Sequence, residues 1–389
     1  MRKTIVFAVA LCCCFSSYAQ LDNGNLDVDE LTGKVLDGAR VVSTGVPLLL
    51  IAPDSRSGGM GDVGAASRPD ANSIHWNAAK LAFMDKKAGI TFTYSPWLKE
   101  IVDDIKLMYL SGYYKLNERS ALGASLTYFS LGAINFFSEF GESIGTYKPN
   151  EFAVDMAYTM KLSDNLSISL TGRYIRSDLT QGQNVGTIAT HAANAGAADI
   201  GLYYQNEIKS EMPSEYAFGV QISNLGSKVS YSDHMESNFL PANLRIGGRY
   251  SVDFDQFNNI SLMLDFNKLL VPTPPVYDED GNIFAGMDPN VGILEGAIQS
   301  FYDAPNGFKE ELQEITVSAG VEYWYNKLLG IRAGYFYEAQ NKGGRQYLTL
   351  GLGLRYNVMG FDLSYLIATS ALNNNPLKNT LRVSLCFDL

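Results

Sequence analysis

Apolar and polar side chains alternate along the chain from about Ala88 to the last residue. In Tyr347–Tyr356, for example, leucines occupy every second position and face away from threonine, glycine and arginine. A period of two places successive side chains on opposite faces of a β-strand. The alternating stretches are about nine to eleven residues long, the length of a strand that crosses a membrane. The pattern therefore predicts an all-β chain with membrane-spanning strands.

The number and order of these stretches predict how they assemble. Fourteen follow one another, an even number as in bacterial outer-membrane barrels. They lie at 88–96, 105–116, 121–131, 150–162, 165–176, 197–206, 214–224, 241–252, 258–268, 312–325, 328–339, 345–356, 359–369 and 379–389. Because tight turns join several of them directly, we predict that residues 88–389 form a 14-stranded antiparallel transmembrane β-barrel.

The connections between the predicted strands alternate in length. Tight polar turns occur at Asn117–Ser120, Ser163–Asp164, Asn326–Lys327 and Asn357–Val358. Long loops fall between them, at 132–149, 177–196, 225–240 and 269–311. Short turns of outer-membrane barrels face the periplasm, so we expect extracellular long loops and periplasmic N- and C-termini. A soluble β-sandwich is the alternative, but the strand lengths and the alternation of loops favour the membrane barrel.

Residues 41–87 precede the strands, and their central stretch Ile51–Phe83 has no clean period of 2 or 3.6. This stretch is dense in glycine, alanine, serine and aspartate, which suits an irregular segment whose backbone passes close to other parts of the chain. We predict that this segment plugs the barrel. Charged residues of both signs occupy predicted inward positions, which suggests ion pairs around such a plug. They are Asp155, Arg173, Arg245, Arg249, Asp265, Glu314, Glu322, Arg332, Glu338, Arg355, Asp362 and Arg382.

The start of the chain has the pattern of an export signal. Arg2 and Lys3 precede the apolar run Ile5–Phe15, and a small-x-small site ends at Ala19. We therefore predict a signal peptide over residues 1–19 and an acidic, loosely ordered lead over residues 20–40. A lipoprotein is the alternative, but the residues before each cysteine of the run fit an acylation site poorly. No later run reaches the roughly 18 apolar residues of a membrane-spanning helix.

Charge and residue counts exclude several classes of function. A net charge of -11 argues against nucleic-acid binding, because proteins that bind nucleic acid usually carry excess positive charge. Only Cys386 lies outside the predicted signal, so no intramolecular disulfide is expected. His75, His191 and His234 are scattered and show no metal-ligand spacing, and no G-x-S-x-G motif is present. We therefore expect no metal, no cofactor and no enzymatic activity.

The predicted loop 269–311 is the feature that a barrel alone explains least. Loops this long are usually functional or disordered, and this one is rich in proline and apolar residues. Within it, 288–300 is predicted to form a short amphipathic helix, and 278–282 a plain turn rather than a calcium site. The loop is interpreted as a docking site, a lid over the barrel mouth, or both. The candidate partner-binding residues are Pro274, Pro275, Phe284, Ile293, Leu294, Phe301 and Tyr302.

Part of the predicted plug has a familiar signature. Residues 46–62, VPLLLIAPDSRSGGMGD, closely resemble the N-terminal signature of the PorV family, and residues 69–77, PDANSIHWN, continue the match. The family often has Asn-Pro-Ala next, whereas this chain has Asn77-Ala78-Ala79. PorV proteins are outer-membrane barrels of the Bacteroidetes type IX secretion system, within the FadL-like superfamily of plugged 14-stranded barrels. The signature residues singled out are Pro53, Asp54, Arg56, Gly58, Gly59, Met60, Gly61, Asp62, Trp76 and Asn77.

The resemblance implies a carrier rather than a conduit. PorV-like barrels bind the giant translocon barrel and receive folded cargo through its C-terminal signal domain. They pass it to a surface sortase and attachment complex, which fixes it to outer-membrane lipopolysaccharide. The resemblance supplies no catalytic residue. One alternative is a FadL-like transporter of hydrophobic ligands, with an apolar pocket near the top of the barrel. Another is an enzyme that trims lipid A, against which the scattered histidines argue.

Overall fold

The computed structural model describes residues 40–96, 104–137, 143–182, 189–232, 237–369 and 379–389. The predicted signal peptide and nearly all of the acidic lead lie outside these residues, as does His234. Residues 40–389 form one compact unit built of a plug segment and a barrel.

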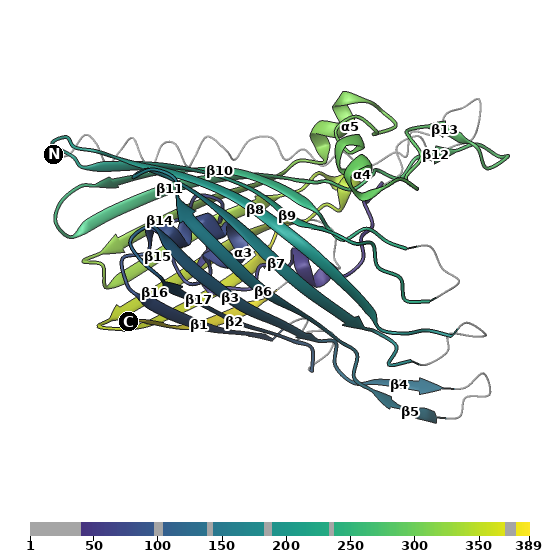
Figure 1. Ribbon diagram of the computed structural model, residues 1–389, viewed down its shortest axis with the longest axis horizontal. Coiled ribbons are helices and arrows are strands. Elements are labelled where there is room, and N and C mark those ends of the chain that lie inside the picture. The colour runs from purple at the N-terminus through teal and green to yellow at the C-terminus, as the bar shows by residue number, and fades with distance from the viewer. Residues whose placement is uncertain (1–39, 97–103, 138–142, 183–188, 233–236, 370–378) are drawn as a thin grey trace. The chain divides into compact units, whose positions relative to one another are not determined.

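Fourteen strands close into an antiparallel barrel in which each strand pairs with the next barrel strand along the chain (Figure 1). The first and last strands complete the circle, with Thr91 opposite Cys386. The barrel strands are β1 (Ala88–Pro96), β2 (Lys106–Lys115), β3 (Ser120–Ser130), β6 (Asn150–Lys161), β7 (Leu166–Asp178), β8 (Ala193–Ile208), β9 (Ser214–Gly226), β10 (Asn243–Asp253), β11 (Asn258–Leu269), β14 (Thr316–Tyr325), β15 (Leu329–Tyr337), β16 (Gln346–Tyr356), β17 (Met359–Ala368) and β18 (Leu381–Asp388).

The predicted fold and strand order are confirmed, and two strands begin about four residues away from their predicted starts. The sixth strand begins at Ala193 rather than at 197, so one long loop is shorter than expected. The tenth begins at Thr316 rather than at 312, because helix α5 (Phe308–Gln313) occupies the residues before it. Two small hairpins lie in long loops: β4 (Ile134–Phe137) with β5 (Ser143–Tyr147), and β12 (Val276–Tyr277) with β13 (Ile283–Ala285).

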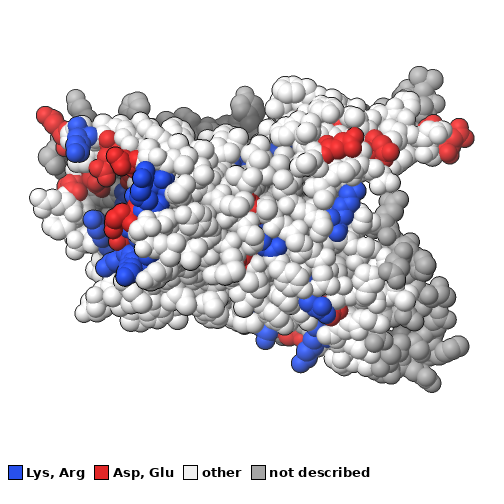
Figure 2. All heavy atoms as spheres, viewed as in Figure 1, with Lys and Arg blue, Asp and Glu red and all other residues white. Residues whose placement is uncertain are grey.

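Side chains alternate between the outer face and the lumen along each barrel strand. In β16 the leucines at 348, 350, 352 and 354 are about half exposed, whereas Thr349 between them is buried. The middle of the outer wall carries few charged side chains in Figure 2, as a face in contact with hydrocarbon requires. The twelve predicted inward charges are buried, or half-buried in the case of Arg245 and Arg355. Among the helices of the described residues, none has the length and apolar character needed to span a membrane.

The plug runs through the lumen from the end with long loops to the end with short turns. It contains only short elements: η1 (Pro47–Leu50), α2 (Ser55–Gly58), α3 (Ser73–Trp76) and η2 (Ala78–Phe83). At the long-loop end, Arg40 donates its backbone N–H to the carbonyl of Asn341, 2.9 Å away. At the short-turn end, Lys87 donates to the carbonyl of Leu389 at 3.1 Å and leads into β1.

Candidate functional site

The longest connection in the barrel, residues 270–315, joins β11 to β14 at the long-loop end (Figure 1). We call it the mouth loop. It contains the β12–β13 hairpin, helix α4 (Ile293–Gln299) and helix α5. Helix α4 lies inside the predicted helical stretch 288–300. The residues 278–282 form the hairpin turn, in which the amide of Asp278 donates to the carbonyl of Asn282 at 2.8 Å.

A buried carboxylate on α5 ties the mouth loop to two other segments. The guanidinium of Arg40, just before the plug, donates two hydrogen bonds of 2.8 Å to Glu310. The ammonium of Lys342, from the loop between β15 and β16, donates to the same carboxylate at 2.7 Å. Burial alone would raise the pKa of Glu310, but the hydrogen bonds from Arg40 and Lys342 outweigh burial and lower its pKa to about 2.

A second set of contacts fixes the base of the mouth loop to the barrel wall. Lys268, near the end of β11, forms ion pairs with Glu311 at 2.9 Å and with Glu314 at 2.7 Å. The hydroxyl of Thr273 also donates to Glu314, at 2.6 Å. The backbone N–H of Thr273 donates to the carboxylate of Asp303 at 3.0 Å. Burial outweighs this hydrogen bond and raises the pKa of Asp303 to about 6. These ion pairs and hydrogen bonds therefore hold the two ends of the mouth loop together beside the end of β11.

Helix α4 is amphipathic in the reverse of the usual sense. Surface helices normally bury their apolar face. Here the small and polar residues Gly296 and Gln299 are buried. A side chain at Gly296 would come within 3.0 Å of the Phe239 ring, so α4 packs closely there. Leu294 and Ile298, one turn apart, point outward and are 66% and 64% exposed. An apolar stripe turned to solvent is a typical mark of a binding surface.

The structure places the predicted partner-binding residues on this loop in two groups. Phe284, Leu294, Phe301 and Tyr302 are exposed, whereas Pro274, Pro275 and Ile293 are half-buried. The prediction omitted further exposed apolar residues of the loop, among them Ile298, Phe308 and Leu312. The four-residue spacing from Leu294 to Ile298 and from Phe308 to Leu312 could have indicated them, since it places each pair on one helix face.

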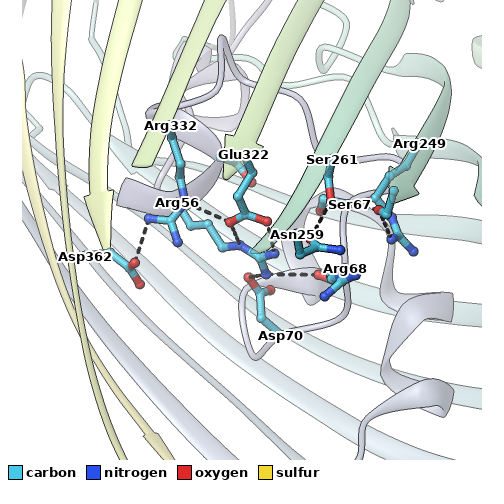
Figure 3. Close-up of polar contacts among 12 residues, drawn as sticks. Arg56, Ser67, Arg68, Asp70, Arg249, Asn259, Ser261, Glu322, Arg332 and Asp362 are labelled. Carbon is cyan, nitrogen blue, oxygen red and sulfur yellow. Dashed lines mark hydrogen bonds and ion pairs between the residues drawn. The ribbon is translucent and has the colours of Figure 1, made fainter. Parts of the chain in front are cut away.

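Arg56 locks the plug to the barrel wall (Figure 3). Its guanidinium donates two hydrogen bonds of 2.9 Å to Glu322 of β14 and one of 3.0 Å to Asp70 within the plug. Glu322 also accepts a 2.8 Å hydrogen bond from Arg332 of β15. Arg332 in turn pairs with Asp362 of β17 at 2.7 Å. Arg56, Glu322, Arg332 and Asp362 therefore form one buried network that joins the plug to three strands.

Glycines let the plug backbone lie directly on the wall. The Cβ that a side chain at Gly59 would need lies 3.0 Å from the Cα of Gly351, a mid-strand glycine of β16. Gly61 has a φ of +70°, and its added Cβ would lie 2.7 Å from the backbone nitrogen of Tyr335. Such contact leaves no space for side chains on either surface. The Gly-Gly-Met-Gly stretch is therefore a packing motif rather than a phosphate loop.

The other signature residues organise the inside of the plug. Asp54 accepts hydrogen bonds from the amide of Ser57 at 2.9 Å and from the indole of Trp76 at 2.6 Å. Asn77 donates across the lumen to the carbonyl of Leu202 at 3.0 Å. Nine of the ten singled-out residues are buried, and Asp62 is half-buried and accepts a hydrogen bond from Tyr347. These residues therefore hold the plug in its fold and against the barrel wall.

A cavity of about 560 Å³ lies above the plug at the long-loop end. Its lining mixes apolar residues such as Leu49 and Phe336 with charged ones such as Arg345 and Glu338. The guanidinium of Arg245 lies over the ring of Trp76, 4.4 Å from its centre. The cavity is therefore more polar than the apolar pocket that the transporter alternative predicts. Within the described part of the chain, His, Cys, Asp and Glu side chains form no group of three that could hold a metal.

Comparison with known proteins identifies the family. Residues 35–276 match the family described as "Type IX secretion system protein PorV". The chain belongs to the PorV family. It is therefore an outer-membrane protein with a role in type IX secretion, and its partners belong to that system. No curated protein gives a significant sequence match.

Several solved structures are similar in fold to this PorV-family chain, all at low sequence identity. The P. putida toluene transporter TodX has a TM-score of 0.48 at 12% identity, over 86% of this chain and 98% of TodX. The CymD monoaromatic hydrocarbon channel has a TM-score of 0.47 at 14% identity, over 89% of this chain and 99% of CymD. A Pseudomonas aeruginosa FadL homologue has a TM-score of 0.42 at 12% identity, over 90% and 100%. At these TM-scores the likeness says nothing about ligands.

Proposed function

We propose that this barrel carries secreted proteins at the cell surface. It binds the translocon barrel of the type IX system and receives cargo through the cargo's C-terminal signal domain. It then delivers the cargo to the sortase and attachment complex, where the cargo is joined to lipopolysaccharide. The observation that carries this proposal is the match to the PorV family over residues 35–276.

The closed lumen supports a carrier over a conduit. The plug is pinned to the wall by the buried pair of Arg56 with Glu322, and Asp70 holds the Arg56 guanidinium from within the plug. Removing one partner of a buried ion pair costs about 3–5 kcal/mol, because the other charge stays buried without its partner. Moving the plug away from the wall would likewise separate Glu322 from Arg56, so the pair favours a plug that stays in place. In a carrier, partners bind to the outer surfaces rather than in the lumen. The mouth loop is the longest connection between barrel strands, and we assign partner binding to Pro274, Pro275, Phe284, Ile293, Leu294, Phe301 and Tyr302 on it.

The proposal also sets the orientation in the membrane. Long loops of outer-membrane barrels face the exterior and short turns the periplasm. The mouth loop is then extracellular, where cargo and attachment complex meet, and Leu389 is periplasmic. The same assignment puts Arg40 at the exterior end, because it is bonded to the mouth loop. The N-terminus is expected to be periplasmic, but the residues that precede Arg40 lie outside those described.

Co-purification tests the function directly. The tagged protein is extracted from its own envelope in mild detergent, and the proteins and lipids that accompany it are identified. We expect a very large barrel together with secreted proteins that share a C-terminal domain. The barrel alone, carrying a bound fatty acid, would instead support the FadL-like transporter.

A further inference from the structure

The outward face of α4 continues past the end of the helix. Leu294, Ile298, Phe301 and Tyr302 follow one another at spacings of four, three and one, so they lie on one side of the helix and its last turn. All four are exposed, and Tyr302 is 60% exposed. We call them the α4 stripe. Single exposed apolar residues are common, but four on one face form a patch that water disfavours.

The exposed charges of the mouth loop have one dominant sign. The exposed charged residues of the mouth loop are Glu279, Asp280, Asp288, Glu295 and Lys309, four acids against one base. Glu295 is on α4 itself. The carbonyl of Asp288 accepts a 3.0 Å hydrogen bond from the Gln299 side chain, which holds that acid beside the helix. Figure 2 shows acidic side chains along the outer edge of the mouth loop, at the right of the view.

The buried cations close to this loop are paired with its acids. Lys268 and Lys342 form ion pairs with Glu311 and Glu310 of α5. The Lys268 ammonium also lies 5.9 Å from the centre of the Phe301 ring, beneath the stripe rather than at its rim. Lys228, from the loop after β9, lies 4.1 Å from the centre of the Phe239 ring. The surface that a partner meets is therefore apolar in the middle and acidic at its rim.

This pattern disfavours a lipid surface as the occupant. Segments that press apolar side chains into a membrane normally flank them with lysine or arginine, which attract anionic lipids. Carboxylates at the rim would repel the phosphates of lipopolysaccharide instead. Opposite charges across an interface raise association rates and fix orientation, so the rim favours a partner with positive charge.

We propose that the α4 stripe binds an apolar patch of the cargo's signal domain that is edged by lysine or arginine. This inference rests on the proposed carrier function and assigns the chemistry of its docking site. The site is preorganised, because the contacts of Glu310, Glu311 and Glu314 fix the loop before any partner arrives. A rigid site loses little conformational entropy on binding.

Binding is measured between the purified full-length barrel in detergent and a purified C-terminal signal domain from a secreted protein of the same organism. The variant Leu294→Ser/Ile298→Ser removes the apolar centre, and Asp288→Lys/Glu295→Lys reverses the rim. The matched control is Glu118→Lys/Asp164→Lys, which reverses two exposed acids at the short-turn end. Heat-resistant mobility on gels checks that every variant is folded.

We expect the serine variant to weaken binding by about tenfold or more. The lysine variant should weaken binding and flatten its dependence on salt, while the control should bind like the wild type. Unchanged binding by both test variants would overturn the inference and leave the carrier function standing. Failure of the wild-type barrel to bind the signal domain would overturn both. Binding of vesicles that contain lipopolysaccharide, abolished by Leu294→Ser/Ile298→Ser, would show that the stripe is a lipid site.

Discussion

Arg56 of the plug and Glu322 of strand β14 are joined by two parallel hydrogen bonds of 2.9 Å. The pair fixes two segments that are far apart in the sequence, and it does so inside the barrel, out of contact with bulk water. Replacing Arg56 leaves the buried Glu322 carboxylate with Arg332 as its remaining partner. The stability of the plug therefore depends strongly on this one side chain.

We predict that Arg56→Met destabilises the folded barrel by about 3 kcal/mol, the low end for breaking a buried ion pair. The measurement is the temperature at which the heat-resistant band unfolds on a gel. Lys309→Met, which removes an exposed cation, should leave that temperature unchanged. Equal temperatures for the two variants would show that the pair contributes nothing to stability.

Gly61→Ala tests the close approach of plug and wall. The change forces an alanine into a left-handed conformation, which costs about 1–2 kcal/mol. It also places Cβ 2.7 Å from the backbone of Tyr335. Gly182→Ala is the matched control, because Gly182 has a similar φ of +74° and nothing within 4 Å of the added Cβ. We expect the unfolding temperature to fall further for Gly61→Ala than for Gly182→Ala. Equal decreases would mean that the backbone around Tyr335 moves to accept the new methyl group without a loss of stability.

Leu385→Arg tests which face of β18 meets lipid. Leu385 points outward and is 41% exposed. An arginine on the lipid face near the middle of the bilayer costs about 2–4 kcal/mol, so assembly should be impaired. Leu294→Arg, on the mouth loop, exposes the same charge to water and should assemble normally. A normal yield of the Leu385 variant would mean that the two faces of β18 are assigned the wrong way round.

The mouth loop should respond to pH in two opposite ways. The pKa of Glu310 is lowered to about 2 from its ordinary value of 4.5. Its stabilising contribution is therefore complete above pH 4.5 and is lost as the pH falls through 2. The pKa of Asp303 is raised from 3.8 to about 6. The loop therefore loses stability as the pH rises from about 4 to 6, because Asp303 must ionise while buried.

Two variants separate these effects. We expect Asp303→Asn to slow hydrogen exchange in residues 301–313 relative to the wild type at pH 7, with no difference below pH 4. Glu310→Gln should speed exchange at pH 7, and that difference should shrink as the pH falls toward 2. Comparison at each pH cancels the intrinsic exchange rate. Parallel trends for the two variants would contradict the assigned shifts.

The sequence alone predicts the barrel well, because the lipid and luminal faces impose alternation on every strand. It also predicts the inward charges, although not their partners. The pairing of Arg56 with Glu322 depends on the conformation of the plug, and the plug sequence has no hydrophobic period from which that conformation could be predicted. Leu312 and Gln313, the last two residues of α5, were predicted as the start of a strand, because the alternating pattern of the following strand extends back to them. The sequence predicts Leu294, Phe301 and Tyr302 as binding residues, but the spacing shows only that an apolar stripe exists, and its exposure on α4 had to come from the structure.

A plug that can be locked in place gives the most direct test of the carrier account. The hydroxyl of Ser384 in β18 donates to that of Ser55 in the plug at 2.8 Å, so cysteines at both positions are well placed for a disulfide. The variant Ser55→Cys/Ser384→Cys is built with Cys386 replaced by serine to avoid mispairing. Secretion and surface attachment of cargo are then measured in cells with the disulfide formed and with it reduced. The account predicts equal secretion in both states, because cargo binds outside the lumen. Loss of secretion only in the oxidised state would contradict it and would show that the plug must move.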